Sequence, residues 1–316
     1  MALLSSLSLA LDTALDRTVV PGFSAIGYAV RRRLPTWPAD PAPDALAGAH
    51  VAVTGATSGL GAATARQLSG LGAHVHLIVR DVGKAEEMSA DLVGPSSAWA
   101  CDLSDLDSVR RCARDISAAA PPLTGLVHNA GALPAERVES AQGHELTMAL
   151  HVLGPVLLTE LLQPLLSAQQ ARVVFVTSGG MYAQPLPVGD PDYTRGDYSG
   201  VTAYARSKRT QVELLGILAE RWAGLRVYAM HPGWVATPGV TQSIPTFNRL
   251  MRPILRDPDA GADTTTWLLA SEPPPPAAGL WKDRRERPTT IFGRFAPTEE
   301  QRQRMWQWVA TAAGIA

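Results

Sequence analysis

From His50 onward, the chain alternates short runs of apolar and β-branched residues with longer stretches whose apolar positions recur at helical spacing. This alternation is typical of repeated βαβ units around a parallel sheet. Runs such as RVVFVT are almost entirely apolar, which indicates strands that are covered on both faces. We predict strands at His50–Thr54, His74–Val79, Ser97–Cys101, Gly125–His128, Arg172–Thr177 and Arg226–Met230, and helices near residues 59–71, 105–119, 142–167 and 201–222.

Residues 1–47 precede this pattern and form an N-terminal extension. Leucine and alanine recur at helical spacing across residues 2–16, which predicts an amphipathic helix followed by a proline-rich linker. The helix either covers an apolar groove of its own domain or docks on a membrane surface, helped by the arginines at 31–33. Asp12 and Asp16 interrupt the apolar stretch, so we expect no signal peptide. We also expect no spanning helix, because no run approaches about 20 apolar residues.

The sequence contains no internal repeat and no second core pattern. We expect an α/β fold with a Rossmann-like doubly wound parallel sheet, in a single domain at residues 48–295. The extension 1–47 precedes it. The prolines at 273–276 end the regular pattern, and we expect a short strand and then a helix near 299–311, in a C-terminal segment 296–316 that packs on the domain.

Composition narrows the class of ligand. The formal net charge is −1 and charged residues make up 18% of the chain, so no basic surface favours nucleic acid. The balance favours a small neutral or amphipathic ligand. The two cysteines, Cys101 and Cys112, do not have metal-ligand spacing, so we expect no metal site, no disulfide framework and a reducing cytoplasm.

The first chemical motif is the glycine-rich turn TGATSGLG, which follows the first predicted strand and opens a predicted helix. Gly55, Gly59 and Gly61 allow a tight turn and close approach of the backbone. The free N–H groups at the start of the helix can then bind the pyrophosphate of a dinucleotide. Because the glycines lie inside a βαβ unit, we interpret the turn as a dinucleotide site rather than a packing feature.

The turn resembles the TGxxxGxG motif of the short-chain dehydrogenase/reductase family, and further family landmarks follow over nearly all of residues 48–295. CDLSD resembles the family's acidic adenine contact, HNAG is similar to NNAG with His128 at its first position, and MHPGWVATPG is similar to the segment beside the nicotinamide. The resemblance implies that the cofactor contacts Gly55, Thr57, Ser58, Gly59, Leu60, Gly61, Asp102, Leu103, Asn129, Ala130, Gly131, Pro232, Gly233, Val235 and Thr237. A purely structural role for Asn129, tying strand ends together, is compatible with cofactor contact.

The choice between NADP and NAD follows from charge at the end of the second predicted strand. NAD is usually held there by a carboxylate that would repel a 2′-phosphate. This chain has Val79 and then Arg80, whose planar guanidinium matches a phosphate. We therefore expect NADP, with NAD as the alternative, because Asp81 could still face the ribose.

The catalytic candidates are Ser178, Tyr204 and Lys208. TAYARSKRT places Tyr204 and Lys208 four residues apart on one helical face, and Ser178 ends the predicted RVVFVT strand, where ligands of such sheets bind. Hydride transfer to a carbonyl leaves an alkoxide that needs a proton and a fixed donor. The resemblance implies that Tyr204 supplies the proton and Ser178 holds the substrate oxygen. Lys208 would lower the pKa of Tyr204 and bind the nicotinamide ribose, with which Tyr204 is also in contact.

One position departs from the family pattern. The family often has a catalytic asparagine on the long helix before Ser178, and His151 aligns with it in MALHVLGP. His151 either orients a water in a proton relay to Lys208 or is a core histidine with a backbone partner.

The predicted substrate pocket is apolar. An insertion at residues 179–203 and the segment 238–260, with Ile244, Phe247, Leu250 and Met251, would border the nicotinamide. We expect a hydrophobic carbonyl or alcohol of retinoid, steroid or lipid type. Strings such as YARSKRTQVEL and GADTTTWLLA resemble one branch of the family. The alternative function is a non-catalytic NADP-binding sensor or scaffold, and relatives suggest a homodimer through helices 142–167 and 201–222.

Overall fold

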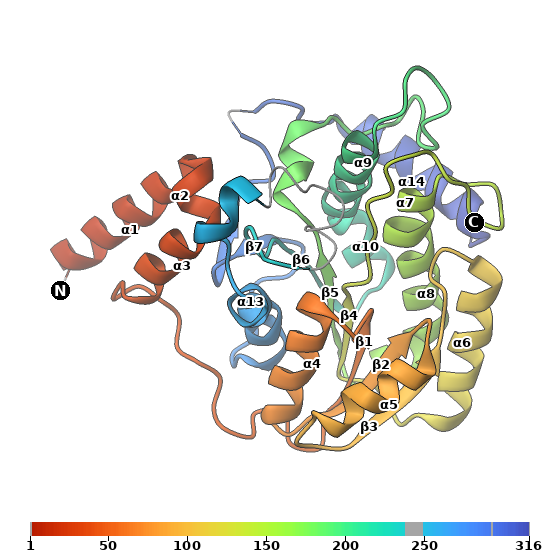
Figure 1. Cartoon of the computed structure of the whole chain (residues 1–316), viewed down its shortest axis with the longest axis horizontal. Helices are drawn as coiled ribbons and strands as arrows, with labels where there is room; N and C mark the ends of the chain where they lie inside the picture. The colour runs from red at the N-terminus through yellow and green to blue at the C-terminus, as the bar shows by residue number, and fades with distance from the viewer. Residues whose placement is uncertain (1, 238–248, 292, 316) are drawn as a thin grey trace.

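The computed structural model describes residues 2–237, 249–291 and 293–315. An eight-stranded sheet runs through this part of the chain, with helices on both faces (Figure 1). The strand order is β3-β2-β1-β4-β5-β6-β7-β8, and all neighbours are parallel except β7 and β8. The strands are β1 (His50–Thr54), β2 (His74–Val79), β3 (Ser96–Ala100), β4 (Gly125–His128), β5 (Arg172–Val176), β6 (Arg226–Met230), β7 (Leu280–Lys282) and β8 (Arg285–Arg287).

The predicted fold class is confirmed, and the six predicted strands are present. Four have the predicted bounds, whereas β3 lies one residue earlier and β5 ends one residue earlier than expected. The single short C-terminal strand that we expected is instead the pair β7 and β8. Asp283 and Arg284 join them with φ values of 54° and 55°. Two successive left-handed residues form the turn type that matches the twist of a tight hairpin.

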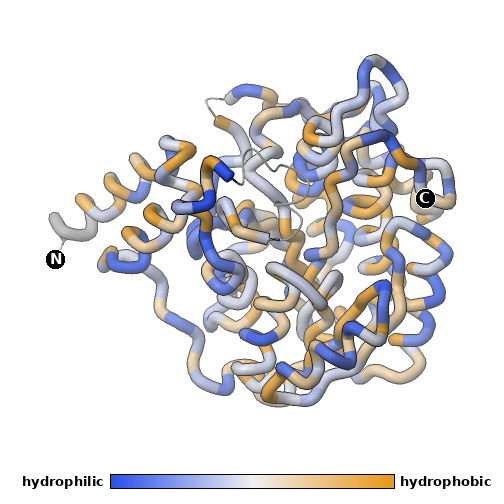
Figure 2. Tube along the Cα trace, viewed as in Figure 1, coloured by the Kyte–Doolittle hydropathy of each residue, from blue (hydrophilic) through white to orange (hydrophobic). Residues whose placement is uncertain are grey.

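Helices cover the two faces of the sheet. On one face, α4 and α13 bury an apolar core that includes Leu68 and Leu268; on the other face, α6 and α8 bury a core that includes Ile116 and Leu162. Apolar residues follow the strands, and many polar residues lie on outer turns and loops (Figure 2). The main-domain helices are α4 (Gly59–Gly70), α5 (Val82–Ala90), α6 (Leu106–Ala119), α7 (Leu146–Met148), η1 (Ala149–Leu153), α8 (Gly154–Ser167), η2 (Gly179–Ala183), α9 (Gly200–Glu213), α10 (Leu215–Arg221), η3 (Arg252–Ile254) and α13 (Pro258–Ala270).

The segment Leu146–Ser167 is the one helical stretch, within the described residues, that is long and apolar enough to cross a membrane. The most apolar window of this stretch is 67% buried inside the protein. We therefore interpret this segment as a core helix of the domain.

The C-terminal helix α14 (Glu299–Ala313) packs against the outer side of this stretch. Arg302 on α14 bonds Glu213 of α9 at 3.0 Å, and Trp306 lies against Arg221 of α10. We expected the helices around residues 142–167 and 201–222 to mediate pairing of two chains. A dimer built on these helices must accommodate or displace α14, so the dimer stays a prediction.

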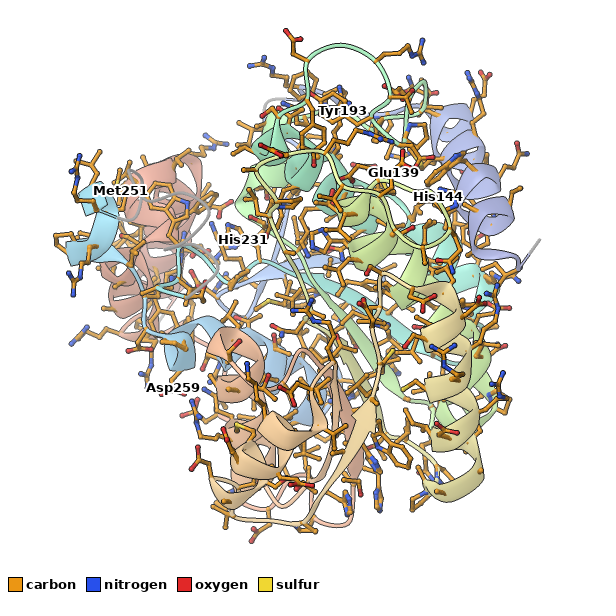
Figure 3. The ribbon with its side chains drawn as sticks, turned by 45° about the vertical axis from the view of Figure 1, so that its right-hand side comes forward. Glu139, His144, Tyr193, His231, Met251 and Asp259 are labelled. Atoms are coloured by element: carbon orange, nitrogen blue, oxygen red, sulfur yellow. The ribbon has the colours of Figure 1, made fainter. Side chains whose placement is uncertain are left out.

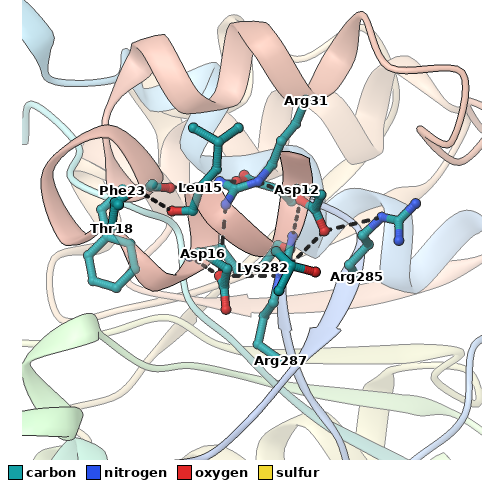
Figure 4. A network of polar contacts seen from close by, with 12 residues as sticks. Asp12, Leu15, Asp16, Thr18, Phe23, Arg31, Lys282, Arg285 and Arg287 are labelled. Carbon is teal, nitrogen blue, oxygen red and sulfur yellow. Dashed lines mark hydrogen bonds and ion pairs between the residues drawn. The ribbon is translucent and has the colours of Figure 1, made fainter. Parts of the chain in front are cut away.

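The extension forms three helices, α1 (Ala2–Arg17), α2 (Val19–Phe23) and α3 (Ala25–Arg32), which lie on the side of the molecule where β7 is found (Figure 1). Buried charges hold them there. The carboxylate of Asp12 accepts from Arg31 at 2.7 Å and from Arg287 at 2.8 and 2.9 Å (Figure 4). Asp283 accepts from Arg31 at 2.7 Å and from Arg256 at 2.6 and 3.0 Å. We call this network the ionic clamp; its members are Asp12, Asp16, Arg31, Arg256, Lys282, Asp283 and Arg287.

The clamp changes the interpretation of the extension. Arg31 is 1% exposed and bonded to two carboxylates, so it is neither a solvated helix end nor a membrane contact. The helix was expected either to cover an apolar groove of its own domain or to dock on a membrane surface, and the structure shows that one side of α1 is fixed by charge. Leu7, Leu9 and Leu11 remain exposed.

Candidate active site

The glycine-rich turn links β1 to α4. Gly55 and Gly59 have φ values of 64° and 52°, in the left-handed region that favours glycine. A Cβ on Gly61 would lie 2.1 Å from the carbonyl oxygen of Gly55 and 2.5 Å from the Asn129 amide nitrogen, so only glycine fits there. Ser58 is the N-cap of α4, but its side chain makes no capping bond. The positive end of the helix dipole thus lies beside a tight backbone turn, which fits a pyrophosphate. Thr57 and Leu60 flank Ser58 and Gly59 in the same turn.

Asn129 follows β4 and joins it to this turn. Its side-chain amide donates to the carbonyl oxygens of Thr54 and Gly55 at 3.0 and 3.3 Å. The Thr54 hydroxyl accepts from the backbone N–H groups of Asn129 and Ala130 at 2.9 and 3.0 Å. The structural role that we expected for Asn129 is therefore present. A Cβ on Gly55 would lie 2.9 Å from the Ala130 Cα, which shows how closely the two strand ends approach.

The charged residues proposed to select the cofactor lie at the ends of β2 and β3. Arg80 is exposed directly after β2. Asp81, which left NAD open as an alternative, caps α5 by accepting from the N–H groups of Gly83 and Lys84 at 3.0 and 3.4 Å. Asp102 accepts from the N–H and hydroxyl of Ser104 at 2.9 and 2.6 Å.

Leu103, predicted to lie near the adenine, is 3% exposed and belongs to the apolar core. Its carbonyl oxygen would lie 2.0 Å from a Cβ on Gly154, so Leu103 packs tightly against the start of α8. Any contact of Leu103 with the cofactor would therefore involve its backbone.

The three catalytic candidates converge at the carboxyl end of β5. The Ser178 hydroxyl interacts with the Tyr204 phenol and accepts from the Gly180 N–H at 3.3 Å. The Lys208 ammonium group, one turn along α9 from Tyr204, donates to the carbonyl oxygen of Val176 at 2.9 Å. It lies 5.6 Å from the centre of the Tyr204 ring. Ser178 and the Val176 carbonyl oxygen at the end of β5 therefore form a single polar site with two side chains of α9.

Burial controls the electrostatics of this site. It raises the pKa of the Tyr204 phenol, and the hydrogen bond with Ser178 opposes this change. It also lowers the pKa of Lys208 to about 7. The expected lowering of the Tyr204 pKa by Lys208 stays a prediction.

His151 lies in the π-helical turn η1 and is fully buried. Its Nε2 atom accepts from the Ala132 N–H at 3.1 Å, so the remaining proton is on Nδ1, which contacts the Ser207 hydroxyl at 2.8 Å. Burial and the nearby Lys208 lower the pKa of His151 well below its usual value. Both ring nitrogens have protein partners, as expected of a core histidine. A Cβ on Gly131 would come within 3.2 Å of this ring.

The segment after β6 contacts the extension. Gly233 has a φ of 78°, and a Cβ there would lie 2.4 Å from Arg256 Nε. Val235 is buried and bridges to Arg256, while Pro232 is buried beside them. Thr237 is the last residue described before 249. Ile244 and Phe247, predicted to line the pocket, lie outside the described residues.

Sequence reasoning missed Phe23. Its carbonyl oxygen accepts from the Trp234 N–H at 2.8 Å, and its ring packs edge-on against His231 with centroids 4.6 Å apart. A Cβ on Gly179 would come within 2.8 Å of the Phe23 ring. Figure 3 shows His231 between the N-terminal helices and the central strands. The extension therefore reaches the residue beside Ser178, which its sequence VVPGF does not reveal.

A dinucleotide-type glycine turn and a Ser-Tyr-Lys site on one parallel sheet define an α/β oxidoreductase. Residues 49–246 match the family model described as short chain dehydrogenase. The chain belongs to the short-chain dehydrogenase/reductase family.

Relatives refine this assignment. The chain is 36% identical to dehydrogenase/reductase SDR family member 12 of Bos taurus over 251 residues, which cover 76% of this chain and 78% of that protein. This similarity confirms the branch that the sequence strings indicated. It is 32% identical to human retinol dehydrogenase 12, covering 85% of this chain and 88% of that protein.

Solved structures show the same fold. A crystal structure of a Mycobacterium paratuberculosis protein is 26% identical, with a TM-score of 0.71 over 87% of this chain and 98% of that chain. A Beutenbergia cavernae protein, solved with NADP bound at low occupancy, is 26% identical with a TM-score of 0.58. It is covered over 92% of its length, and this chain over 73%.

Proposed function

We propose that this protein exchanges a hydride between NADP(H) and a carbonyl or alcohol carbon of a hydrophobic small molecule. The observation that carries the proposal is the convergence of Ser178, Tyr204 and Lys208 at the carboxyl end of β5. Ligands of open α/β sheets bind at this edge.

The residues at the turn fit a dinucleotide, because Gly55 and Gly59 take left-handed backbone conformations that form a tight turn and the α4 N-terminus is not capped by Ser58. When bound, NADP supplies or accepts the hydride. Ser178 holds the substrate oxygen through its hydroxyl, and Tyr204 donates a proton to that oxygen during reduction or removes it during oxidation. Lys208 binds the nicotinamide ribose, and its positive charge favours the phenolate whenever it is protonated.

NADP is proposed over NAD because of the two residues after β2. The Asp81 carboxylate is engaged in capping α5, whereas Arg80 is exposed and can approach a 2′-phosphate. The NADP-bound relative from Beutenbergia cavernae is consistent with this choice.

The substrate class follows from apolar residues near the site and from a relative. Phe23 packs beside Gly179, and Leu250 is 73% exposed in the segment that we expect to border the nicotinamide. The relative retinol dehydrogenase 12 is named for a hydrophobic alcohol. We therefore propose a retinoid, steroid or lipid-like aldehyde, ketone or alcohol.

The test is a turnover screen with purified full-length protein. NADPH oxidation is followed with a panel of hydrophobic aldehydes, ketones and quinones, and then repeated with NADH. We expect turnover of at least one hydrophobic carbonyl, with NADPH preferred. Tight NADPH binding without turnover across the panel would contradict the proposal.

That contrary result would support the second candidate, a sensor or scaffold that binds NADP without reaction. His151 is the observation that favours this candidate, because both of its ring nitrogens are engaged where the family often has a catalytic asparagine. His151→Asn separates the two functions. Turnover that increases in this variant indicates an enzyme, whereas a turnover of zero in both proteins indicates a sensor.

We also propose contact with the cytoplasmic surface of a membrane through α1 and α2. Leu7, Leu11 and Val20 are exposed on these helices, while Asp12 is held in the ionic clamp. The apolar side chains can therefore enter a lipid surface while the helices stay docked. Full-length protein should bind anionic vesicles, and Leu7→Ser/Leu11→Ser should abolish this binding. Deleting residues 2–20 should lower the Tm even without lipid, because it removes clamp carboxylates.

A further inference from the structure

Three histidines gather at the end of the sheet opposite the catalytic residues. His50 is the first residue of β1 and His74 the first residue of β2, and the two are register partners in the parallel pair. His76 lies two residues further along β2, on the same face of the sheet as His74. The ring centres of His50 and His74, and of His74 and His76, are 4.7 and 4.8 Å apart.

The imidazole nitrogens of the three histidines lie close together. One ring nitrogen from each histidine lies within 4.8 Å of the others, and His50 Nδ1 is 3.0 Å from His76 Nε2. Zinc bonds to imidazole nitrogens at about 2.0–2.1 Å in tetrahedral geometry, which separates ligand nitrogens by roughly 3.3 Å. The rings of His50 and His74 stack at an interplanar angle of 28°, and those of His74 and His76 at 25°. Side-chain rotations that open this stack, and that break the 2.9 Å contact of His74 Nε2 with the Ser97 hydroxyl, would place all three nitrogens around one ion. His50 and His74 are half-buried, so they can rotate and leave an open position for water.

We propose that His50, His74 and His76 bind one divalent transition-metal ion of the zinc type at the amino-terminal edge of the sheet. Three imidazoles form a recognised zinc donor set. Imidazole also suits copper and nickel, so those ions can serve as probes. The ion would cross-link β1 to β2 and would not touch the hydride-transfer residues. The proposal is therefore independent of the proposed function.

The protonation of the cluster favours metal binding. Burial lowers the pKa of His76 to about 4 and also lowers the pKa of His74, with the neighbouring imidazoles adding to both effects. Neutral imidazole is the form that binds metal. The expectation of no metal rested on cysteine spacing, which could not show that three histidines from two strands meet.

Trp99 supplies an internal test of the geometry. Its indole N–H lies 3.1 Å from His76 Nδ1, and indole can only donate. His76 Nδ1 therefore accepts, and its proton is on Nε2, facing His50. An ion at Nε2 moves this proton to Nδ1, where it faces the indole N–H. Trp99 must turn aside, so metal binding competes with this hydrogen bond.

The first experiment is calorimetric titration of tag-free, chelator-treated full-length protein with ZnCl2. We expect one zinc ion per chain and a rise in Tm upon binding. His50→Gln and His74→Asn should each weaken zinc binding at least tenfold. His144→Gln is the matched control, because His144 contacts Asp192 and Trp308 outside the cluster (Figure 3). Its zinc affinity should equal that of the wild type.

The second experiment uses Trp99→Phe, which keeps an aromatic ring but removes the competing N–H. Zinc should bind this variant roughly three- to tenfold more tightly, in line with the loss of one hydrogen bond. Cobalt bound to the wild type should show visible absorption that zinc displaces, which tests the site without a substitution. Absence of stoichiometric zinc binding by the wild type, or wild-type zinc affinity in both His50→Gln and His74→Asn, would overturn the proposal.

Discussion

The ionic clamp and the active site both bury charged side chains, and they differ in how those charges are compensated. In the ionic clamp, carboxylates meet guanidinium groups: Asp283 lies 2.7 Å from Arg31 and 2.6 Å from Arg256. In the active site, Lys208 donates to the carbonyl oxygen of Val176. In the described part of the chain, no carboxylate lies within ion-pair distance of Lys208.

The difference separates a structural network from a reactive one. The arginines hold the pKa of Asp283 well below its usual range despite burial, so this carboxylate stays charged near neutral pH. Burial lowers the pKa of Lys208 to about 7, so Lys208 changes protonation near neutral pH. Perturbed groups of this second kind are concentrated in functional sites. The paired charges of the ionic clamp fix the extension, whereas the unpaired Lys208 remains available to bind a ligand.

The largest expected effect separates activity from stability at Tyr204. Tyr204→Phe removes the proton donor, and we expect kcat to fall by about 10³-fold with the best substrate from the screen. The Tm should change little, because the phenol bonds to Ser178 rather than to the surrounding scaffold. The measurements are steady-state turnover and thermal unfolding. A large fall in Tm would place Tyr204 among the structural groups.

A substitution in the ionic clamp should lower stability and leave activity nearly unchanged. Asp283→Asn leaves Arg31 and Arg256 buried with an incomplete partner, so we expect the free energy of unfolding to fall by about 3–5 kcal/mol. Thermal unfolding should report this as a Tm lower by roughly 5–10 °C, with little change in kcat. Asp107→Asn is the control, since its pair with Arg110 is exposed. Equal Tm values for the two variants would remove the distinction between the regions.

Arg80 extends the comparison to an exposed charge. Arg80→Ala should weaken NADPH binding roughly tenfold or more, because it removes a charged hydrogen-bond donor from the 2′-phosphate. NADH binding should change little. Titration of both cofactors checks this prediction, with exposed Lys84→Ala as a neighbouring control. Equal losses for NADPH and NADH would contradict a phosphate-binding role.

The smallest effect is a pH dependence of stability from Lys208. Its pKa is about 7 when folded, against 10.5 as its ordinary value. Between these values the unfolded chain binds more protons than the folded chain, so the contribution of Lys208 to stability rises with pH. It is progressively lost as pH falls from about 10.5 to 7. Lys208→Met should raise the Tm most below pH 7. This advantage should shrink by several degrees toward pH 10. A constant difference in Tm would mean that burial leaves the Lys208 pKa unchanged.

Local patterns determine most of what the sequence could predict. The apolar runs locate β1, β2, β4 and β6 with correct bounds, because strands covered on both faces must be apolar. Tyr204 and Lys208 could be paired because helical spacing places them on one face, and Ser178 because strand ends share an edge. These inferences need no knowledge of distant contacts.

The remaining features depend on contacts between distant segments. Asp12 and Arg287 are 275 residues apart, so no local pattern predicts their ion pair. Phe23 reaches Gly179 only because the clamp docks α2 there. The two ring partners of His151 come from the backbone of Ala132 and from Ser207 on α9. The histidine cluster requires the register of β1 with β2.

The most direct test of the catalytic assignment is a single-turnover reaction with NADPH deuterated at the transferring position. For the wild type, we expect deuterium on the carbinol carbon of the product. Tyr204→Phe should form this product at least about 100-fold more slowly while binding NADPH with unchanged affinity. Product without deuterium, or equal single-turnover rates in the two proteins, would contradict the account.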